Sequence, residues 1–337
     1  MSGTKRSPAT ALLLAGLGLL ATARCGGWAV AEEACDVWEG HTGGVTDLVV
    51  LSGGEQAASC GLDGTVKLWD ARSGRFVKDL VSGGGEIFAV SADAVGRRIA
   101  ATGYDGRIWI VDLKKNSKRA LSGFRGWSAG VALSPDSRRV AAWSMDGDIW
   151  IYDADSGGRV KTLKGQPKKW GMALAWSPDG KTLAAARSVI SLWDVESGKA
   201  VKTLEGHQDF VRALAFSPEG KRLASASMDK SVKVWNLFEG KETLALKPEG
   251  FAFYADEEWV TAPIRLPATA AAFSADGKSL ATAGADRIVR LWDAETGILK
   301  KEFKGHRRTV TAVAFLPDGR GLVSSSLDHT IRAWKMD

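Results

Sequence analysis

Hydrophobic and polar residues alternate with period two along most of this chain, in short runs that turn residues separate. The segment 211–216 reads Val-Arg-Ala-Leu-Ala-Phe and is followed by a turn at 217–220, a second run at 223–227 and a third at 231–235. Because side chains two residues apart lie on the same face of a strand, this alternation predicts half-buried strands. We therefore expect an all-β chain built from small antiparallel sheets.

One marker of three residues, hydrophobic then usually aromatic then polar, recurs seven times along the chain. Its central residues are Trp69, Val111, Tyr152, Trp193, Trp235, Trp292 and Trp334. The steps between them are 42, 41, 41, 42, 57 and 42 residues, and such a period is typical of repeat architectures in which each unit is one small sheet. The longer fifth step indicates one loop insertion, which we place at about 248–266.

Two further signals recur in register with the marker. A Gly-His pair places His41, His207 and His306 each 28 residues before a marker Trp. An Asp stands six residues before the marker in six units, namely Asp63, Asp105, Asp146, Asp229, Asp286 and Asp328. With these motifs the chain resembles the WD-repeat (WD40) family over residues 34–337. The resemblance implies a seven-bladed β-propeller, with four-stranded antiparallel blades around a central channel.

The last repeat unit has one strand fewer than the blade requires. It offers strands at 310–315, 321–325 and 330–334, and the sequence ends at Asp337. The segment 34–39, just before the first Gly-His pair, offers the missing outer strand. We expect the ring to be closed by this N-terminal strand pairing with the last blade, which would leave no open seam.

The family resemblance also implies a role for the recurring His, Ser, Asp and Trp residues. In that family they form a buried hydrogen-bond chain that holds the strands of a blade together. Complete sets here are His41, Ser59, Asp63 and Trp69, then His207, Ser225, Asp229 and Trp235, then His306, Ser324, Asp328 and Trp334. Since the same constellation recurs, we interpret it as structural. Blades two to four lack the full set and are expected to rest more on apolar packing.

Candidate chemistry is sparse outside these sets. Only His329 remains of the four histidines, and no Cys-x-x-Cys, phosphate-binding loop or nucleophile elbow is present in the sequence. We therefore expect a protein that is not an enzyme and that uses no cofactor or metal. Cys35 and Cys60 could pair in an oxidising compartment or remain two buried thiols.

One face of the predicted propeller is rich in aromatic residues. In the WD-repeat family the ligand surface is formed by the residue before the Asp and by positions at the start of the innermost strand. Those positions here, together with the insert, give Phe88, Tyr104, Trp127, Met145, Trp170, Met172, Phe210, Arg212, Met228 and Trp259. Such residues are enriched at interface hot spots, although several could instead pack between blades.

Two function classes are compatible with that surface. We favour a protein–protein interaction scaffold whose face binds a protein or peptide, and the alternative is a propeller that binds a small molecule or carbohydrate on its aromatic residues. The sequence specifies neither the partner nor an oligomeric state.

The first 31 residues differ in composition from the rest. Lys5 and Arg6 precede an apolar run at 10–23, and Ala29-Val30-Ala31 is typical of signal-peptidase cleavage. We therefore predict a cleaved signal peptide at 1–31, a propeller at 32–337, and export to the periplasm or extracellular space. The alternative is an uncleaved segment that tethers the domain to a membrane.

Removal of that segment also changes the charge balance. It lowers the Lys and Arg count from 45 to 42 against 39 Asp and Glu, so the net charge falls from +6 to +3. A surface so nearly balanced gives no electrostatic reason to expect nucleic-acid binding or stable membrane insertion of the mature chain.

Overall fold

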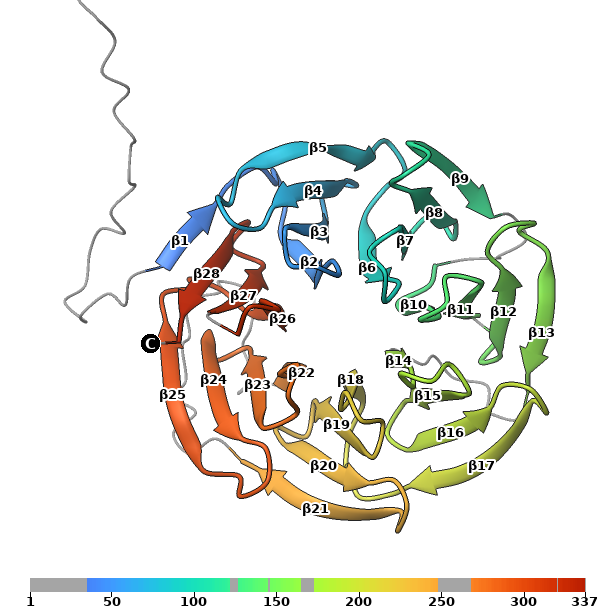
Figure 1. The fold of residues 1–337 in the computed structure, drawn as a ribbon, viewed down its shortest axis with the longest axis vertical. Helices are drawn as coiled ribbons and strands as arrows, with labels where there is room; N and C mark the ends of the chain where they lie inside the picture. The colour runs from blue at the N-terminus through green and yellow to red at the C-terminus, as the bar shows by residue number, and fades with distance from the viewer. Residues whose placement is uncertain are drawn as a thin grey trace, which may run out of the picture. The chain divides into compact units, whose positions relative to one another are not determined.

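The computed structural model describes residues 35–121, 127–144, 146–164, 173–247, 268–319 and 321–336. All regular structure in these residues is β, arranged as seven four-stranded antiparallel sheets around a central channel (Figure 1). The predicted seven-bladed propeller is therefore confirmed. Within the same residues no helix is long and apolar enough to cross a membrane.

Each blade runs from an innermost strand at the channel to an outermost strand at the circumference. Blade one comprises β2 (Val45–Val50), β3 (Gln56–Gly61), β4 (Val66–Asp70) and β5 (Phe76–Val81). Blade two comprises β6 (Ile87–Ala92), β7 (Arg98–Gly103), β8 (Ile108–Asp112) and β9 (Ser117–Leu121). Blade three comprises β10 (Val131–Leu133), β11 (Arg139–Trp143), β12 (Ile149–Asp153) and β13 (Arg159–Leu163). Blade four comprises β14 (Ala173–Trp176), β15 (Thr182–Ala186), β16 (Ile190–Asp194) and β17 (Lys199–Leu204). Blade five comprises β18 (Val211–Phe216), β19 (Arg222–Ser227), β20 (Val232–Asn236) and β21 (Lys241–Leu246). Blade six comprises β22 (Ala268–Phe273), β23 (Ser279–Gly284), β24 (Ile288–Asp293) and β25 (Leu299–Lys304). Blade seven comprises β26 (Val310–Phe315), β27 (Gly321–Ser326), β28 (Ile331–Lys335) and β1 (Cys35–Trp38).

The strand order gives the ring two rims. Because neighbouring strands are antiparallel, the chain enters every innermost strand from the rim that also carries the hairpins between second and third strands. We call this the upper rim, and it holds Leu62, Tyr104 and Phe210. The lower rim carries the other two hairpins of each blade, among them 93–97 and 236–240.

The N-terminal strand closes the ring as predicted. Strand β1 pairs antiparallel with β28, with Cys35 opposite Trp334 and Trp38 opposite Ile331 (Figure 1). Trp38 is buried at the junction of blades seven and one, where its ring centroid lies 6.0 Å from that of Trp69. Closure therefore combines a strand ladder with a large apolar side chain.

The hydrophobic core consists of seven separate layers, one between each pair of neighbouring blades. The layer between blades one and two, for example, joins Leu68 and Val66 to Ile99 and Val90. Neighbouring blades cover both faces of each blade near the channel, so strands such as β7 and β11 consist almost entirely of buried residues. The rims and the outermost strands are thereby left to face solvent.

Candidate functional site

The structure brings each of the three His-Ser-Asp-Trp sets together inside its own blade. In blade five the ring of His207 lies 2.7 Å from Asp229 Oδ2 through Nδ1 and 2.7 Å from Ser225 Oγ through Nε2. Trp235 Nε1 donates to the same Ser225 oxygen at 2.9 Å. The sets of blade one and blade seven have the same contacts at 2.7–2.9 Å. Because these polar atoms hydrogen-bond to one another inside the blade, the four residues of each set serve to hold its strands together.

The direction of each hydrogen bond in these sets follows from the charges. Burial lowers the pKa of His41 and of His306, so both rings are neutral at pH 7. Burial alone would raise the pKa of Asp328, but hydrogen bonds from His306, Thr330 and the backbone outweigh it and hold that pKa well below its usual range. The ionised Asp accepts from Nδ1–H, so Nε2 accepts from the Ser hydroxyl, which accepts from the indole.

Blade six uses a different polar centre because it has no Gly-His pair. Arg290 is buried on β24, where its guanidinium bonds to Asp286 at 2.5 Å and to Glu302 at 2.9 Å. Trp292 Nε1 donates to Thr282 Oγ1 at 2.7 Å. Arg290 thus makes the contact with the Asp that the His makes in other blades. Lys67, Lys233 and Arg332 stand at the same four-residue spacing in the blades that keep the His, so the spacing alone could not have revealed the replacement.

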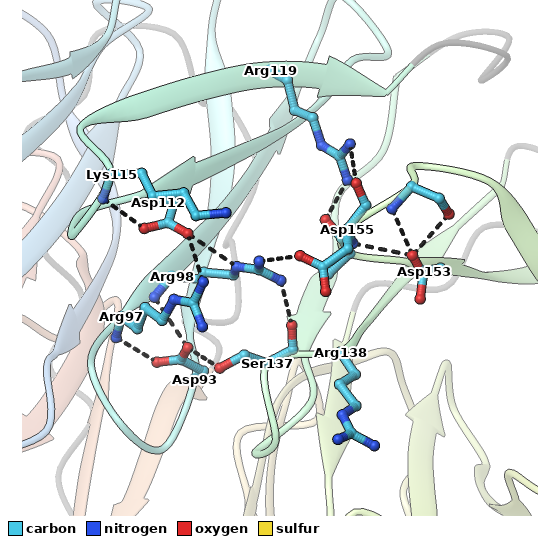
Figure 2. A network of polar contacts seen from close by, with 12 residues as sticks. Asp93, Arg97, Arg98, Asp112, Lys115, Arg119, Ser137, Arg138, Asp153 and Asp155 are labelled. Carbon is cyan, nitrogen blue, oxygen red and sulfur yellow. Dashed lines mark hydrogen bonds and ion pairs between the residues drawn. The ribbon is translucent and has the colours of Figure 1, made fainter.

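Blades two and three are joined at the lower rim by an ionic network around the buried Arg98 (Figure 2). Arg98 of β7 is 5% exposed, contacts Asp112 at 3.6 Å and Asp155 of blade three, and donates to the Ser137 carbonyl at 2.9 Å. Arg119 of β9 donates to two carbonyls of the same blade-three turn. The expectation that these blades rest more on apolar packing is therefore incomplete, because polar contacts also join strands of blade two to turns of blade three.

A cavity of about 560 Å³ lies at the centre of the ring and is lined by the innermost strands. Thr46, Thr269 and Thr311 occupy equivalent places on β2, β22 and β26. Each hydroxyl donates to the first carbonyl of the next blade's innermost strand, Thr46 to Ile87 at 2.6 Å and Thr311 to Val45 at 2.8 Å. These small polar residues stitch neighbouring blades together, and Phe88 and Arg212 occupy the same place in blades two and five.

The described lining of the cavity holds two charged residues, Asp47 and Arg212. Asp47 stands where other innermost strands have Ala89, Ala213 or Ala312, and its carboxylate accepts from the backbone N–H of Leu48 at 2.8 Å and of Val90 at 2.9 Å. Burial raises the pKa of Asp47 to about 7 despite these two donors. An acid in place of these Ala residues is a signal visible in the sequence, although Asp47 was not among the predicted site residues.

The predicted partner-binding residues that the structure describes fall into two groups. Tyr104 and Phe210 are solvent-exposed on the upper rim, at 66% and 38%, and Met228 lies half-buried beside Phe210. Phe88 and Trp127 line the cavity and contact each other edge to face, with ring centroids 6.2 Å apart. The surrounding channel wall lowers the pKa of the Arg212 guanidinium by desolvation.

The remaining predicted partner-binding residues, Met145, Trp170, Met172 and Trp259, lie outside the described residues, as does the insert at 248–266. Cys35 and Cys60 form no disulfide, and Cys60 is buried. In the described part of the chain no three His, Cys, Asp or Glu side chains are grouped as metal ligands would be.

Comparison with known proteins bears on the repeats directly. The family described as "WD domain, G-beta repeat" matches residues 33–70, 198–236, 265–293 and 297–335, which contain Trp69, Trp235, Trp292 and Trp334. These four segments carry WD repeats. WD-repeat propellers generally serve as scaffolds for protein interactions and are typically not catalytic.

A curated relative, "WD repeat-containing protein 18" of Bos taurus, is similar to part of the chain. The two are 40% identical over 79 residues, which is 23% of this chain and 18% of the relative. The similarity therefore supports the WD-repeat assignment of a segment, and it spans less than a fifth of the relative's length.

Proposed function

We propose that this WD-repeat propeller is a non-catalytic scaffold whose upper rim binds a protein or peptide partner. The observation that carries the proposal is the exposure of Tyr104 and Phe210 on that rim, with the Phe88–Trp127 pair at the channel. Large aromatic side chains exposed on a folded surface are typical of interface hot spots, because they bury much area with few rotatable bonds. The closed ring holds them on a rigid frame.

Single Ala substitutions test this assignment. We expect Tyr104→Ala and Phe210→Ala each to weaken binding of a partner by about 2 kcal/mol, the usual contribution of a hot-spot aromatic. The partner is first isolated from the cell fraction that contains the native protein, identified, purified and titrated against each variant by calorimetry. Because both side chains are exposed, we expect melting temperatures to stay close to that of the unmodified protein.

The chain offers a matched control on the other rim. Phe238 is 93% exposed in the hairpin at 236–240, so Phe238→Ala removes an exposed aromatic of similar size from the lower rim. The proposal requires this variant to bind normally. A partner that loses affinity with Phe238→Ala, and binds Tyr104→Ala and Phe210→Ala normally, would place the interface on the lower rim.

A small molecule or carbohydrate in the channel is the second candidate, and the cavity of about 560 Å³ beside Trp127 and Arg212 favours it. That volume lies within the range of about 300–1,000 Å³ usual for small-ligand sites. A glycan array probed with the unmodified protein and with Trp127→Ala distinguishes this candidate. Binding of a defined glycan that the variant loses would favour it over the protein partner.

We also propose that residues 1–31 direct export and are then removed, on the basis of the basic start, the apolar run and the small residues at 29–31. N-terminal sequencing of the protein from its native cell fraction tests this. A mature chain that begins at Glu32 agrees with export, whereas a chain that retains 1–31 favours the membrane-tethered alternative.

A further inference from the structure

Blade four is the blade in which the buried tryptophan has lost its hydrogen-bond acceptor. Trp193 of β16 is 3% exposed, and its Nε1–H has no hydrogen-bond partner among the residues that the structure describes. The four other Trp residues at this repeat position donate to Ser59, Ser225, Thr282 and Ser324. Blade four has only Ala residues at 184–186 on the neighbouring strand β15, and its hairpin is shorter. A buried N–H without an acceptor is rare in folded proteins, so its environment is informative.

The unpaired indole lines a cavity of about 720 Å³. The cavity exists because the outermost strand presents small residues there: Ala200 pairs with Trp193, where Phe76, Glu242 and Leu299 pair with the Trp of blades one, five and six. In blade one the ring of Phe76 covers Trp69 with centroids 5.9 Å apart. Replacement of such a side chain by Ala leaves space above Trp193.

The described lining of this cavity is cationic. It contains Lys164, Arg187 and Lys199 and no Asp or Glu. Arg187 stands at the repeat's Asp position, and its Nε–H is a second buried donor that has no partner within the described part of the chain. In addition, the third and fourth strands of blade four place Ser191 opposite Thr203. At the same place, blades one and six pair a base with an acid, Lys67 with Asp79 and Arg290 with Glu302. The described lining of this cavity thus contains several N–H donors but none of the acidic partners that bases have in blades one and six.

We propose that the cavity of blade four binds an oxyanion of the phosphate or sulfate type. The indole and guanidinium N–H groups would donate to its oxygens, and Lys164 and Lys199 would balance its charge. Such an anion supplies several acceptors to two donors that are otherwise unpaired, and charge-assisted bonds of this kind are the strong ones. Arg187 also stacks over Phe210 at 5.6 Å, which places the site next to the upper rim. The inference does not depend on the proposed partner-binding function.

The indole proton of Trp193 is a direct reporter of this site. In nitrogen–proton NMR spectra of the full chain, Trp193→Phe identifies the resonance by its disappearance. We expect inorganic phosphate to move that resonance downfield saturably, while sodium chloride at equal ionic strength leaves it in place. The Trp69 resonance should stay unchanged, because its N–H already bonds to Ser59.

The matched variants are Arg187→Gln and Arg138→Gln, the latter removing an exposed arginine on the lower rim. We expect Arg187→Gln to weaken phosphate binding on the order of tenfold, as loss of one charge-assisted bond would, and Arg138→Gln to leave it unchanged. An unmoved Trp69 resonance shows that each variant is folded.

O-phospho-L-serine, titrated in parallel, distinguishes the source of the anion. Tighter binding of inorganic phosphate indicates a free ion, and tighter binding of phosphoserine indicates a group carried on a side chain. If neither ligand moves the Trp193 resonance beyond the chloride control, or if Arg187→Gln binds as well as the unmodified chain, the proposal is overturned.

Discussion

Replacement of Asp229 by Ala is expected to lower the free energy of unfolding by about 3 kcal/mol. The carboxylate of Asp229 accepts from His207 Nδ1 at 2.7 Å, from the Gln208 N–H at 2.9 Å, and from the Ser231 N–H and hydroxyl at 2.9 and 2.6 Å. Ala leaves these donors without an acceptor, and His207 is buried. Urea titration monitored by tryptophan fluorescence measures the loss.

Asp105 provides the matched control because it occupies the same repeat position in blade two, where there is no Gly-His pair. Its carboxylate, on a side chain that is 23% exposed, accepts a backbone N–H from Arg107 at 2.9 Å and lies 3.8 Å from the Arg107 guanidinium. We expect Asp105→Ala to destabilise by less than about 1 kcal/mol. Equal losses of unfolding free energy in the two variants would mean that the buried hydrogen bonds of blade five add no stability beyond that of an ordinary turn Asp.

The pH dependence of stability offers a second check on the same residue. Burial would raise the pKa of Asp229, but the hydrogen bonds from His207, Ser231 and the backbone outweigh it and hold that pKa below its usual range. An acid with a lowered folded-state pKa stabilises fully above its unfolded pKa of about 4, and the contribution is lost as pH falls through the folded value. When the pH is lowered below 4, the free energy of unfolding of Asp229→Ala should therefore fall by less than that of the unmodified chain.

Much of the fold could be predicted because each blade repeats one local pattern. The alternation of strands, the marker Trp residues and the Gly-His pairs act within about 40 residues, so the sequence places them in register without knowledge of the ring. The closing strand was also predictable, since the last unit lacked one strand and 34–39 offered it. Strand β1 at Cys35–Trp38 confirms that expectation.

The contacts that the sequence did not reveal are those that join different blades. Arg98 and Asp155 are 57 residues apart, and nothing in either local sequence shows that the two side chains meet. The interblade bonds of Thr46 and Thr311 depend in the same way on the curvature of the ring. Likewise, the site proposed beside Trp193 combines a missing acceptor with a cavity next to Ala200 on the next strand, and each feature alone is ordinary in sequence.

The candidate partner surface shows the same division. Exposure of Tyr104 and Phe210 agrees with positions chosen from the repeat, whereas the edge-to-face contact of Phe88 with Trp127 requires blades two and three to be neighbours. An aromatic residue at such a position can serve packing and binding together. The binding role of all these residues stays a prediction until a partner is titrated.

Deletion of residues 34–39 is expected to have the largest effect on the protein, because it removes β1 and opens the ring. The backbone of β28 would lose its ladder to Cys35–Trp38 and present an unpaired edge, which favours association with other chains. Loss of Trp38 also empties a buried site beside Trp69, and removal of a core Trp usually costs about 3–5 kcal/mol. We expect a lower melting temperature, a broader transition and concentration-dependent aggregation by light scattering.

Two point variants separate the contributions to closure. Trp38→Ala keeps the strand ladder and removes the packed side chain, so it should melt at a lower temperature than the unmodified chain yet keep the same oligomeric state. Asp36→Ala changes an exposed residue of β1 and should behave like the unmodified chain. If the deleted chain stays monomeric and melts cooperatively at the normal temperature, β1 is dispensable, and the seven core layers between blades suffice to hold the ring closed.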